Sequence, residues 1–270
     1  VSEINGLKFL SDKQSFTDKV NAAGSIDAVA SILSEAKAQD AAEQLTKSKV
    51  DAIADVNALS GLNDSEKASF ADKINASTTL NGVASAVSDA KTVAKLNTYK
   101  ESAKTTVSNL TKLSDESKAG YTNRIKSEIS TTNVDAIVAE AKAESQLIQD
   151  KESAVSEIKA LVNLSGKEQA SFADAVTNAA SKSTVDTVVS TAKAQGQKNL
   201  EAKQLEELRV DVKAKISDMD YLSDAQKQDF ASKVDAAVTK TDVSNLLVNA
   251  NATNDLEKAK PKATTKINNL

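Results

Sequence analysis

The side chains that most often carry out protein chemistry are scarce in this chain of 270 residues. It contains no histidine and no cysteine. The usual ligand sets for zinc, haem and iron–sulfur clusters are therefore absent, as are nucleophiles activated by histidine. Any reaction would depend on carboxylates, lysines or tyrosines alone. The composition predicts that the chain is not an enzyme and binds no metal or cofactor.

The densest acidic cluster consists of Asp218, Asp220 and Asp224. Carboxylates this close together could bind calcium, but the segment lacks the glycine and terminal glutamate of a calcium-binding loop. Asp224 follows Ser223, where a helix is expected to begin and a carboxylate is favoured by the helix dipole. We expect a structural role for this cluster. No pair among the 38 acidic residues stands out as a glycosidase pair.

Charge and hydropathy exclude two classes of partner. The chain has 34 basic and 38 acidic side chains, giving a net charge of −4 with no basic stripe, so we expect no nucleic-acid partner. No apolar run approaches the length of a membrane span, and no charged segment followed by an apolar one opens the sequence, so we expect neither membrane insertion nor a signal peptide within it. The chain begins at Val1 with a repeat already under way, so we expect it to be a piece of a longer protein.

A fivefold repeat supplies the structural elements. Each copy has an aromatic residue, a β-branched residue four positions later, and an alanine twenty positions later that we expect near the end of a helix. Successive aromatics are 54, 51, 51 and 58 residues apart, which indicates a tandem array. The aromatics are Phe16, Phe70, Tyr121, Phe172 and Phe230; their followers are Val20, Ile74, Ile125, Val176 and Val234; the alanines are Ala36, Ala90, Ala141, Ala192 and Ala250.

The first helix of each copy is predicted from three apolar residues at a spacing of three. In the last four copies a further apolar residue stands four positions earlier, which marks the buried face of an amphipathic helix. A sixth copy begins with Ala263 and Ile267 and reaches Leu270. The triplets are Ile4-Leu7-Leu10, Val56-Leu59-Leu62, Val107-Leu110-Leu113, Ile158-Leu161-Leu164 and Ile216-Met219-Leu222, and the preceding residues are Ala52, Ala103, Ala154 and Val212.

The second helix carries the aromatic residue and begins at a predicted N-cap. Four copies have Glu or Gln three residues after the cap, which predicts a capping box. The exception is Ser114, followed by Ser117. In the first copy the aromatic comes only five residues after the cap, instead of seven, so we expect a shortened helix there. The four predicted boxes are Ser11–Gln14, Asn63–Glu66, Ser165–Glu168 and Ser223–Gln226.

The third helix is predicted to open at a polar cap followed by an apolar residue. The apolar residue of this opening lies 10 positions after the aromatic in two copies and 13 positions after it in three. In those three copies the loop would be about one helical turn longer and the third helix one turn shorter. The predicted openings are Ser25-Ile26, Thr79-Leu80, Asn133-Val134, Thr184-Val185 and Asp242-Val243.

No glycine or proline separates most third helices from the next first helix, as in the segment from Val83 to Leu110. We therefore expect continuous helices, with a bend or a looser joint at Gly196 and a break at Pro261. A net rise of about 30 Å per repeat would give a monomeric rod on the order of 150 Å long. The predicted fold class is all-α, a tandem array of three-helix bundles joined by long continuous helices into an elongated rod.

These caps, aromatics and third-helix openings resemble the GA-like, albumin-binding type of three-helix module, which occurs with FIVAR modules in giant surface proteins of Gram-positive bacteria. The resemblance implies an extracellular, cell-wall-anchored array. In albumin binders of this type, contact is made by the second helix and the start of the third, which correspond here to Phe70–Val83 and Phe172–Val188. The segments after Phe16, Phe70 and Phe172 carry Thr-Asp-Lys, Ala-Asp-Lys and Ala-Asp-Ala in place of the aromatic and basic residues of the binders, so no binding residues are assigned.

From these features we expect a spacer that projects a distal adhesive domain from the cell wall. The alternative is a multivalent module that binds a host plasma or matrix protein such as serum albumin, using avidity. We expect repeats at residues 1–40, 41–94, 95–145, 146–197 and 198–253, with the start of a sixth at 254–270. The first helix of the first repeat is expected to be truncated.

Overall fold

The computed structural model describes residues 1–268, and within them it contains eleven helices and no strand. The expected all-α fold class is confirmed. The chain divides into two compact units, Val1–Gln146 and Leu147–Leu270. Leu270, the last expected apolar position of the sixth repeat, lies outside the described residues.

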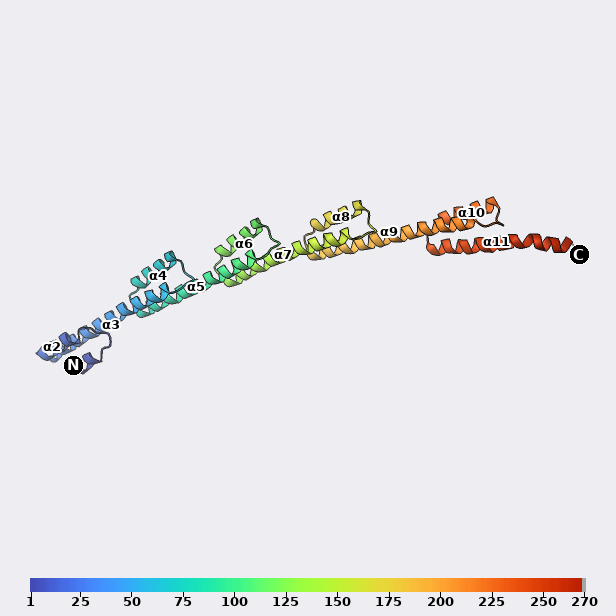
Figure 1. The fold of residues 1–270 in the computed structure, drawn as a ribbon. Helices are drawn as coiled ribbons and strands as arrows, with labels where there is room; N and C mark the ends of the chain where they lie inside the picture. Colours follow the sequence, from blue (N-terminus) through green and yellow to red (C-terminus); the bar gives the residue numbers. More distant parts are fainter. Residues whose placement is uncertain (269–270) are drawn as a thin grey trace. The chain divides into compact units, whose positions relative to one another are not determined.

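From α2 onward, short and long helices alternate along the chain (Figure 1). In each unit the short helices lie alongside long ones, which form the other two members of each bundle. The short helices are α1 (Ser2–Gly6), α2 (Lys13–Ala22), α4 (Asp64–Ala76), α6 (Asp115–Ser127), α8 (Gly166–Thr177) and α10 (Asp224–Ala236). The long helices are α3 (Ile26–Asn57), α5 (Leu80–Ser108), α7 (Thr131–Lys159), α9 (Lys182–Ser217) and α11 (Lys240–Asn268).

The continuity of the long helices is confirmed. Helix α5, for example, buries Val83 and Ala90 against α3 and α4, and then continues to Ala103 and Val107, which are buried in the next repeat. Burial of these small apolar residues removes carbon surface from water and is the main source of stability in such thin bundles. One helix thus supplies the third helix of one repeat and the first helix of the next.

The repeated apolar positions form the core, but the triplets are not wholly helical. Val56 is fully buried inside α3, whereas Leu59 and Leu62 follow the helix end at Asn57. Each of these leucines donates its backbone N–H to the carbonyl three residues earlier, Leu59 to Val56 and Leu62 to Leu59. Consecutive tight turns therefore preserve the spacing of three that the sequence pattern had attributed to a helix.

The alanines twenty residues after each aromatic are fully buried. Each lies within a long helix and not near a helix end, which corrects the expectation for these positions. A methyl side chain allows two helices to approach closely at this level of the bundle.

Three of the four predicted capping boxes form, at Asn63–Glu66, Ser165–Glu168 and Ser223–Gln226. The first one is wrong. Helix α2 begins at Lys13 with Asp12 as its cap, whose carboxylate accepts the N–H of Ser15. Ser11 instead donates its backbone N–H and its hydroxyl to Glu43 of α3. The helix is shortened to 10 residues, as expected.

The predicted openings at Asn133, Thr184 and Asp242 are also wrong. In the structure Ser130, Ser181 and Thr239 accept the capping N–H bonds, three residues earlier than predicted. With Ser25 and Thr79, every cap then lies nine residues after the aromatic, so no turn moves between loop and helix. The predicted pattern treats Ile26 and Leu80 as equivalent to Val134, Val185 and Val243. The first two side chains are 86% and 39% exposed, whereas the three valines are buried, so the two sets occupy different positions in the repeat.

The break predicted at Pro261 is wrong, and no linker interrupts the helix at Gly196. Helix α9 runs through Gly196, which packs beside Leu164, and α11 runs through Pro261. A proline inside a helix removes one hydrogen bond, here to the carbonyl of Glu257, without requiring the helix to end. Gly61, which lies inside the triplet predicted to be helical, lies in the turn after α3.

The five repeated aromatics point toward the bundle interiors. Phe16 and Phe70 are buried, and Tyr121, Phe172 and Phe230 are partly buried. By contrast, Tyr99 and Tyr221, which fall outside the repeated positions, are 38% and 44% exposed. The repeated aromatics are therefore core residues.

Candidate functional site at the joints between repeats

The joints are the places where a long helix leaves one bundle and enters the next, and they are held by a repeated cation. In four repeats a lysine or arginine of the long helix donates to a carbonyl at the C-terminal end of the adjacent short helix. We name these four residues the cation clasp: Lys49 to Asn75 (2.7 Å), Lys100 to Lys126 (3.1 Å), Lys151 to Thr177 (2.9 Å) and Arg209 to Ala237 (2.5 Å).

The positions of the clasp follow the repeat. Each cation lies 21 residues before the aromatic of the bundle that it contacts. The last carbonyls of a helix lack intrahelical partners and carry the negative end of the helix dipole, so a cation stabilises them. The clasp therefore fixes the short helix to the joint. The constant distance from the aromatic is visible in the sequence, but the partner carbonyl on the other helix is not.

A second set of contacts holds the start of the short helix. Asn97 Nδ2 donates to the carbonyl of Gly61 (3.0 Å) and to Oε1 of Glu66 (3.0 Å). Asn199 does the same to Asn163 (2.9 Å) and to Oε2 of Glu168 (3.1 Å). Both asparagines lie 27 residues after the aromatic, and Glu43 and Glu257 occupy this position in the first and fifth repeats. The capping glutamates thus also connect to the long helix.

Hydrogen bonds lower the pKa of two carboxylates in these contacts, Glu168 and Glu43. The backbone N–H of Ser165 lowers the pKa of Glu168, with further contributions from the Ser165 hydroxyl and Asn199. The side chains of Gln39 and Ser11 lower the pKa of Glu43 in the same direction. Donors to the ionised form cause both shifts, so these carboxylates are stabilised as acceptors.

The third repeat replaces this arrangement with a polar network around Tyr121. Its hydroxyl donates to Oε2 of Glu144 (2.7 Å), and Ser117 donates to Oε1 of the same carboxylate (2.9 Å). Arg124 lies over the tyrosine ring, 5.5 Å from its centroid, and pairs with Glu140 (2.7 Å). Burial, followed by the hydrogen bond to Glu144, raises the pKa of Tyr121 to about 12. The tyrosine is therefore a donor that ties α6 to α7.

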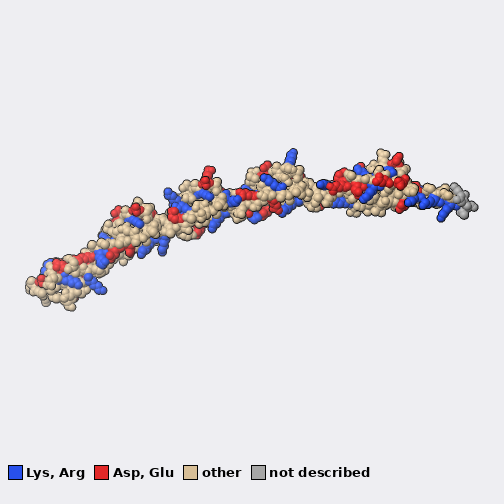
Figure 2. Space-filling view, in the orientation of Figure 1, with Lys and Arg blue, Asp and Glu red and all other residues tan. Residues whose placement is uncertain are grey.

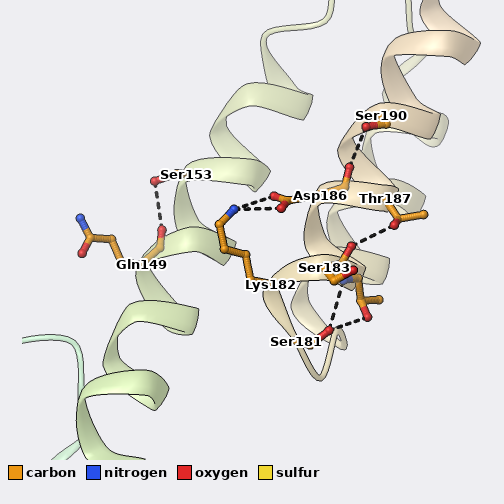
Figure 3. A network of polar contacts seen from close by, with 9 residues as sticks. Gln149, Ser153, Ser181, Lys182, Ser183, Asp186, Thr187 and Ser190 are labelled. Atoms are coloured by element: carbon orange, nitrogen blue, oxygen red, sulfur yellow. Dashed lines mark hydrogen bonds and ion pairs between the residues drawn. The ribbon is translucent and has the colours of Figure 1, made fainter. Parts of the chain in front are cut away.

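The polar contacts at the start of α9 are local (Figure 3). Lys182 donates to both oxygens of Asp186, at 2.8 and 2.9 Å, and this contact raises the pKa of Lys182. Thr187 and Ser190 donate to the carbonyls of Ser183 and Asp186, four residues earlier. Such bonds satisfy the hydroxyls within the helix. They leave no activated nucleophile in this network.

The acidic cluster lies at the turn between α9 and α10. Asp218 is the C-cap residue of α9 and Asp224 is the first residue of α10. Within residues 1–268 no group of three or more carboxylates could hold a metal ion. The structure therefore gives no sign of calcium binding at this cluster.

The surface suggested by the family resemblance lies along α4 and the start of α5, and along α8 and the start of α9. Phe70, Ile74 and Val83 of the first segment are buried, whereas Leu80 is exposed. On the visible face, acidic and basic side chains are interspersed in both units (Figure 2). In the part of the chain that the structure describes, no helix is long and apolar enough to cross a membrane.

Taken together, the shared helices and repeated joints define a tandem array of three-helix modules. Comparison with protein families identifies the module: the GA module model matches residues 1–42, 42–95, 93–146, 144–198 and 202–256. The chain belongs to the GA module family.

Among solved structures, the crystal structure of EbhA (756-1003 domain) from Staphylococcus aureus is similar to this chain. The two share 15% sequence identity with a TM-score of 0.35, over 77% of this chain and 98% of that one. No curated protein sequence matches the chain.

Proposed function

We propose that the chain is a spacer in a surface protein of a Gram-positive bacterium, in which GA modules set the distance between the cell wall and a distal adhesive domain. The observation that carries the proposal is the sharing of helices. In α3, α5 and α9 the helix continues from one bundle into the next without a flexible linker, and the cation clasp fixes the next short helix to it. With a repeated connection of this kind, each added module lengthens the array, and this function needs no catalytic site.

Small-angle X-ray scattering tests the spacer. A thin rod of about 150 Å has a radius of gyration of roughly 43 Å, with the length taken from a rise of about 30 Å per module. A compact chain of this size would give about 18 Å. We also propose the repeat boundaries given above, so deletion of residues 95–145 should shorten the maximum dimension by about 30 Å. A radius of gyration close to the compact value would refute the spacer.

A second candidate function, binding of a host protein such as serum albumin, is favoured by exposed apolar residues at one recurring place. Ile26, Ile129 and Val238 are 86%, 86% and 78% exposed, and Leu80 is 39% exposed. All four lie in or next to the turn between a short helix and the following long helix. Apolar anchors repeated along an array would suit weak, multivalent binding.

Immobilised chain and purified serum albumin test this alternative. Replacement of Ile26, Leu80, Ile129 and Val238 by serine should abolish binding if the turns are the anchors. Serine at the equally exposed Val50 and Val162, which are 64% and 88% exposed, serves as the control. Absence of albumin binding by the unmodified chain at high loading would eliminate albumin as the ligand and leave the spacer.

A further inference from the structure

A shallow depression of about 580 Å³ lies where the turn after α3 packs against α5. Leu59, Gly61, Ala94 and Tyr99 contribute its apolar part. This volume falls within the range of ligand sites in proteins. The depression is away from the turn between short and long helices that carries the exposed apolar anchors described above.

The polar part of the lining consists of two lysines of α5, Lys91 and Lys95, and of three hydroxyl residues, and none of the lining residues is acidic; the hydroxyl residues are Ser60, Thr98 and Ser102. Both lysines are exposed, and neither forms an ion pair or hydrogen bond with another described residue. Asp55, which lines the groove on the other side of Lys91, is not paired with it. Like charges four residues apart on a helix repel each other. A bound anion would relieve that repulsion.

The absence of acid is specific to the second module. At the equivalent positions the other four modules each carry a carboxylate. Asp40 replaces Ala94 in the first module and Asp255 replaces Lys95 in the fifth, while the position of Tyr99 is taken by Asp150 in the third and Glu201 in the fourth. A negative side chain there would repel an anion, and the second module alone has none at these three positions. The carboxylate of Asp135 in α7 contacts Tyr99 by accepting a hydrogen bond from its hydroxyl.

We propose that this depression binds a small amphipathic anion. The apolar body of the ligand lies against Leu59, Ala94 and the ring of Tyr99, and its single negative group lies between the ammonium groups of Lys91 and Lys95. Binding needs both parts, because lysines at a surface attract anions only weakly and because the apolar lining is too open to hold an uncharged chain by itself.

Octanoate is a suitable probe, with octyl glucoside as an uncharged molecule of the same chain length and propionate as an anion with little apolar surface. The full chain is titrated with each below its micelle concentration, and backbone amide shifts are followed by NMR. Octanoate should give saturable shifts confined to residues 59–62 and 91–102. Octyl glucoside and propionate should give none that saturate.

Charge reversal of the two lysines, Lys91→Glu with Lys95→Glu, should weaken octanoate binding at least fivefold. The matched control is Lys142→Glu with Lys198→Glu, which makes the same change in net charge at exposed lysines of other modules and should leave binding unchanged. Circular dichroism establishes that both variants keep their helices. Equal affinity of the Lys91/Lys95 variant and the unmodified chain, or shifts spread evenly over all modules, would overturn the proposal.

Discussion

The close approach of the turn at Gly61 to α5 predicts opposite effects of two glycine-to-alanine changes. A Cβ on Gly61 would lie 2.2 Å from the carbonyl oxygen of Ala94 and 2.7 Å from the hydroxyl of Thr98. Backbone would have to move by about 1 Å, and overpacking of this kind costs roughly 1–3 kcal/mol. A Cβ on Gly196 meets nothing closer than 3.8 Å. There alanine should stabilise α9 by up to about 1 kcal/mol through helix propensity.

Hydrogen exchange measured by mass spectrometry resolves these effects by module. Gly61→Ala should accelerate exchange in α4 by about 5- to 150-fold, because a cost of roughly 1–3 kcal/mol changes an opening equilibrium by that factor. Gly196→Ala should slow exchange in α9. Gly120→Ala in α6 is the control, since its Cβ would meet nothing within 4 Å and should show the propensity gain alone. Unchanged protection of α4 in Gly61→Ala would refute the argument from close approach.

Three further predictions concern single side chains. Lys151→Met removes the cation from the end of α8 and should destabilise that module by about 1 kcal/mol, measured as faster exchange in α8. Lys142→Met, at an exposed lysine with no partner among the described residues, should not. Because the folded pKa of Tyr121 is raised to about 12 above an unfolded value of about 10, its contribution to stability should be complete below pH 10 and be lost as the pH rises through 12. Absorbance near 295 nm and alkaline unfolding of Tyr121→Phe check this, and a normal titration of all three tyrosines would contradict it. Pro261→Ala restores a backbone donor to the carbonyl of Glu257 in α11. This should raise the free energy of local opening around residue 261 by up to about 3 kcal/mol and so slow hydrogen exchange there. Faster exchange would contradict the prediction.

The repeat allowed much of the fold to be predicted from the sequence. Apolar spacing and the missing breakers gave the helices and their continuity, because burial periodicity is a local signal. The starts of α7, α9 and α11 failed for a reason that is also local. Val134 and Ile26 each follow a polar residue, and only the bundle shows that Val134 is buried and Ile26 exposed. A constant distance of nine residues from aromatic to cap would have distinguished them.

The joint residues could not be assigned from sequence, since their partners come from a different helix. Lys49 and Asn75 are 26 residues apart, and nothing near either residue indicates the contact. Predicting it requires knowing that the end of α4 lies opposite that turn of α3. The same holds for Asn97 and Gly61. Helix α9 continues through Gly196 although a lone glycine usually weakens a helix, and this glycine faces another segment, the turn at Asn163 and Leu164.

That segment suggests a compensation between modules. The turn residue at position 61 and the helix residue at position 94 are glycine and alanine in the second module, and the equivalent pair in the fourth is Asn163 and Gly196. In each pair one partner is glycine. In the second module the glycine lets turn and helix approach closely, whereas in the fourth a Cβ on Gly196 would lie 3.8 Å from the side chains of Asn163 and Leu164, in ordinary contact. Gly61→Asn should therefore be destabilising, and Ala94→Gly alone should cost about 1 kcal/mol in the helix. The double variant reproduces the fourth module, so its cost in α4 hydrogen exchange should be smaller than the sum of the two by about 1 kcal/mol or more. Strict additivity of the two free-energy changes would show that positions 61 and 94 are not coupled where the turn crosses the helix. The glycine in each module would then have its own, independent explanation.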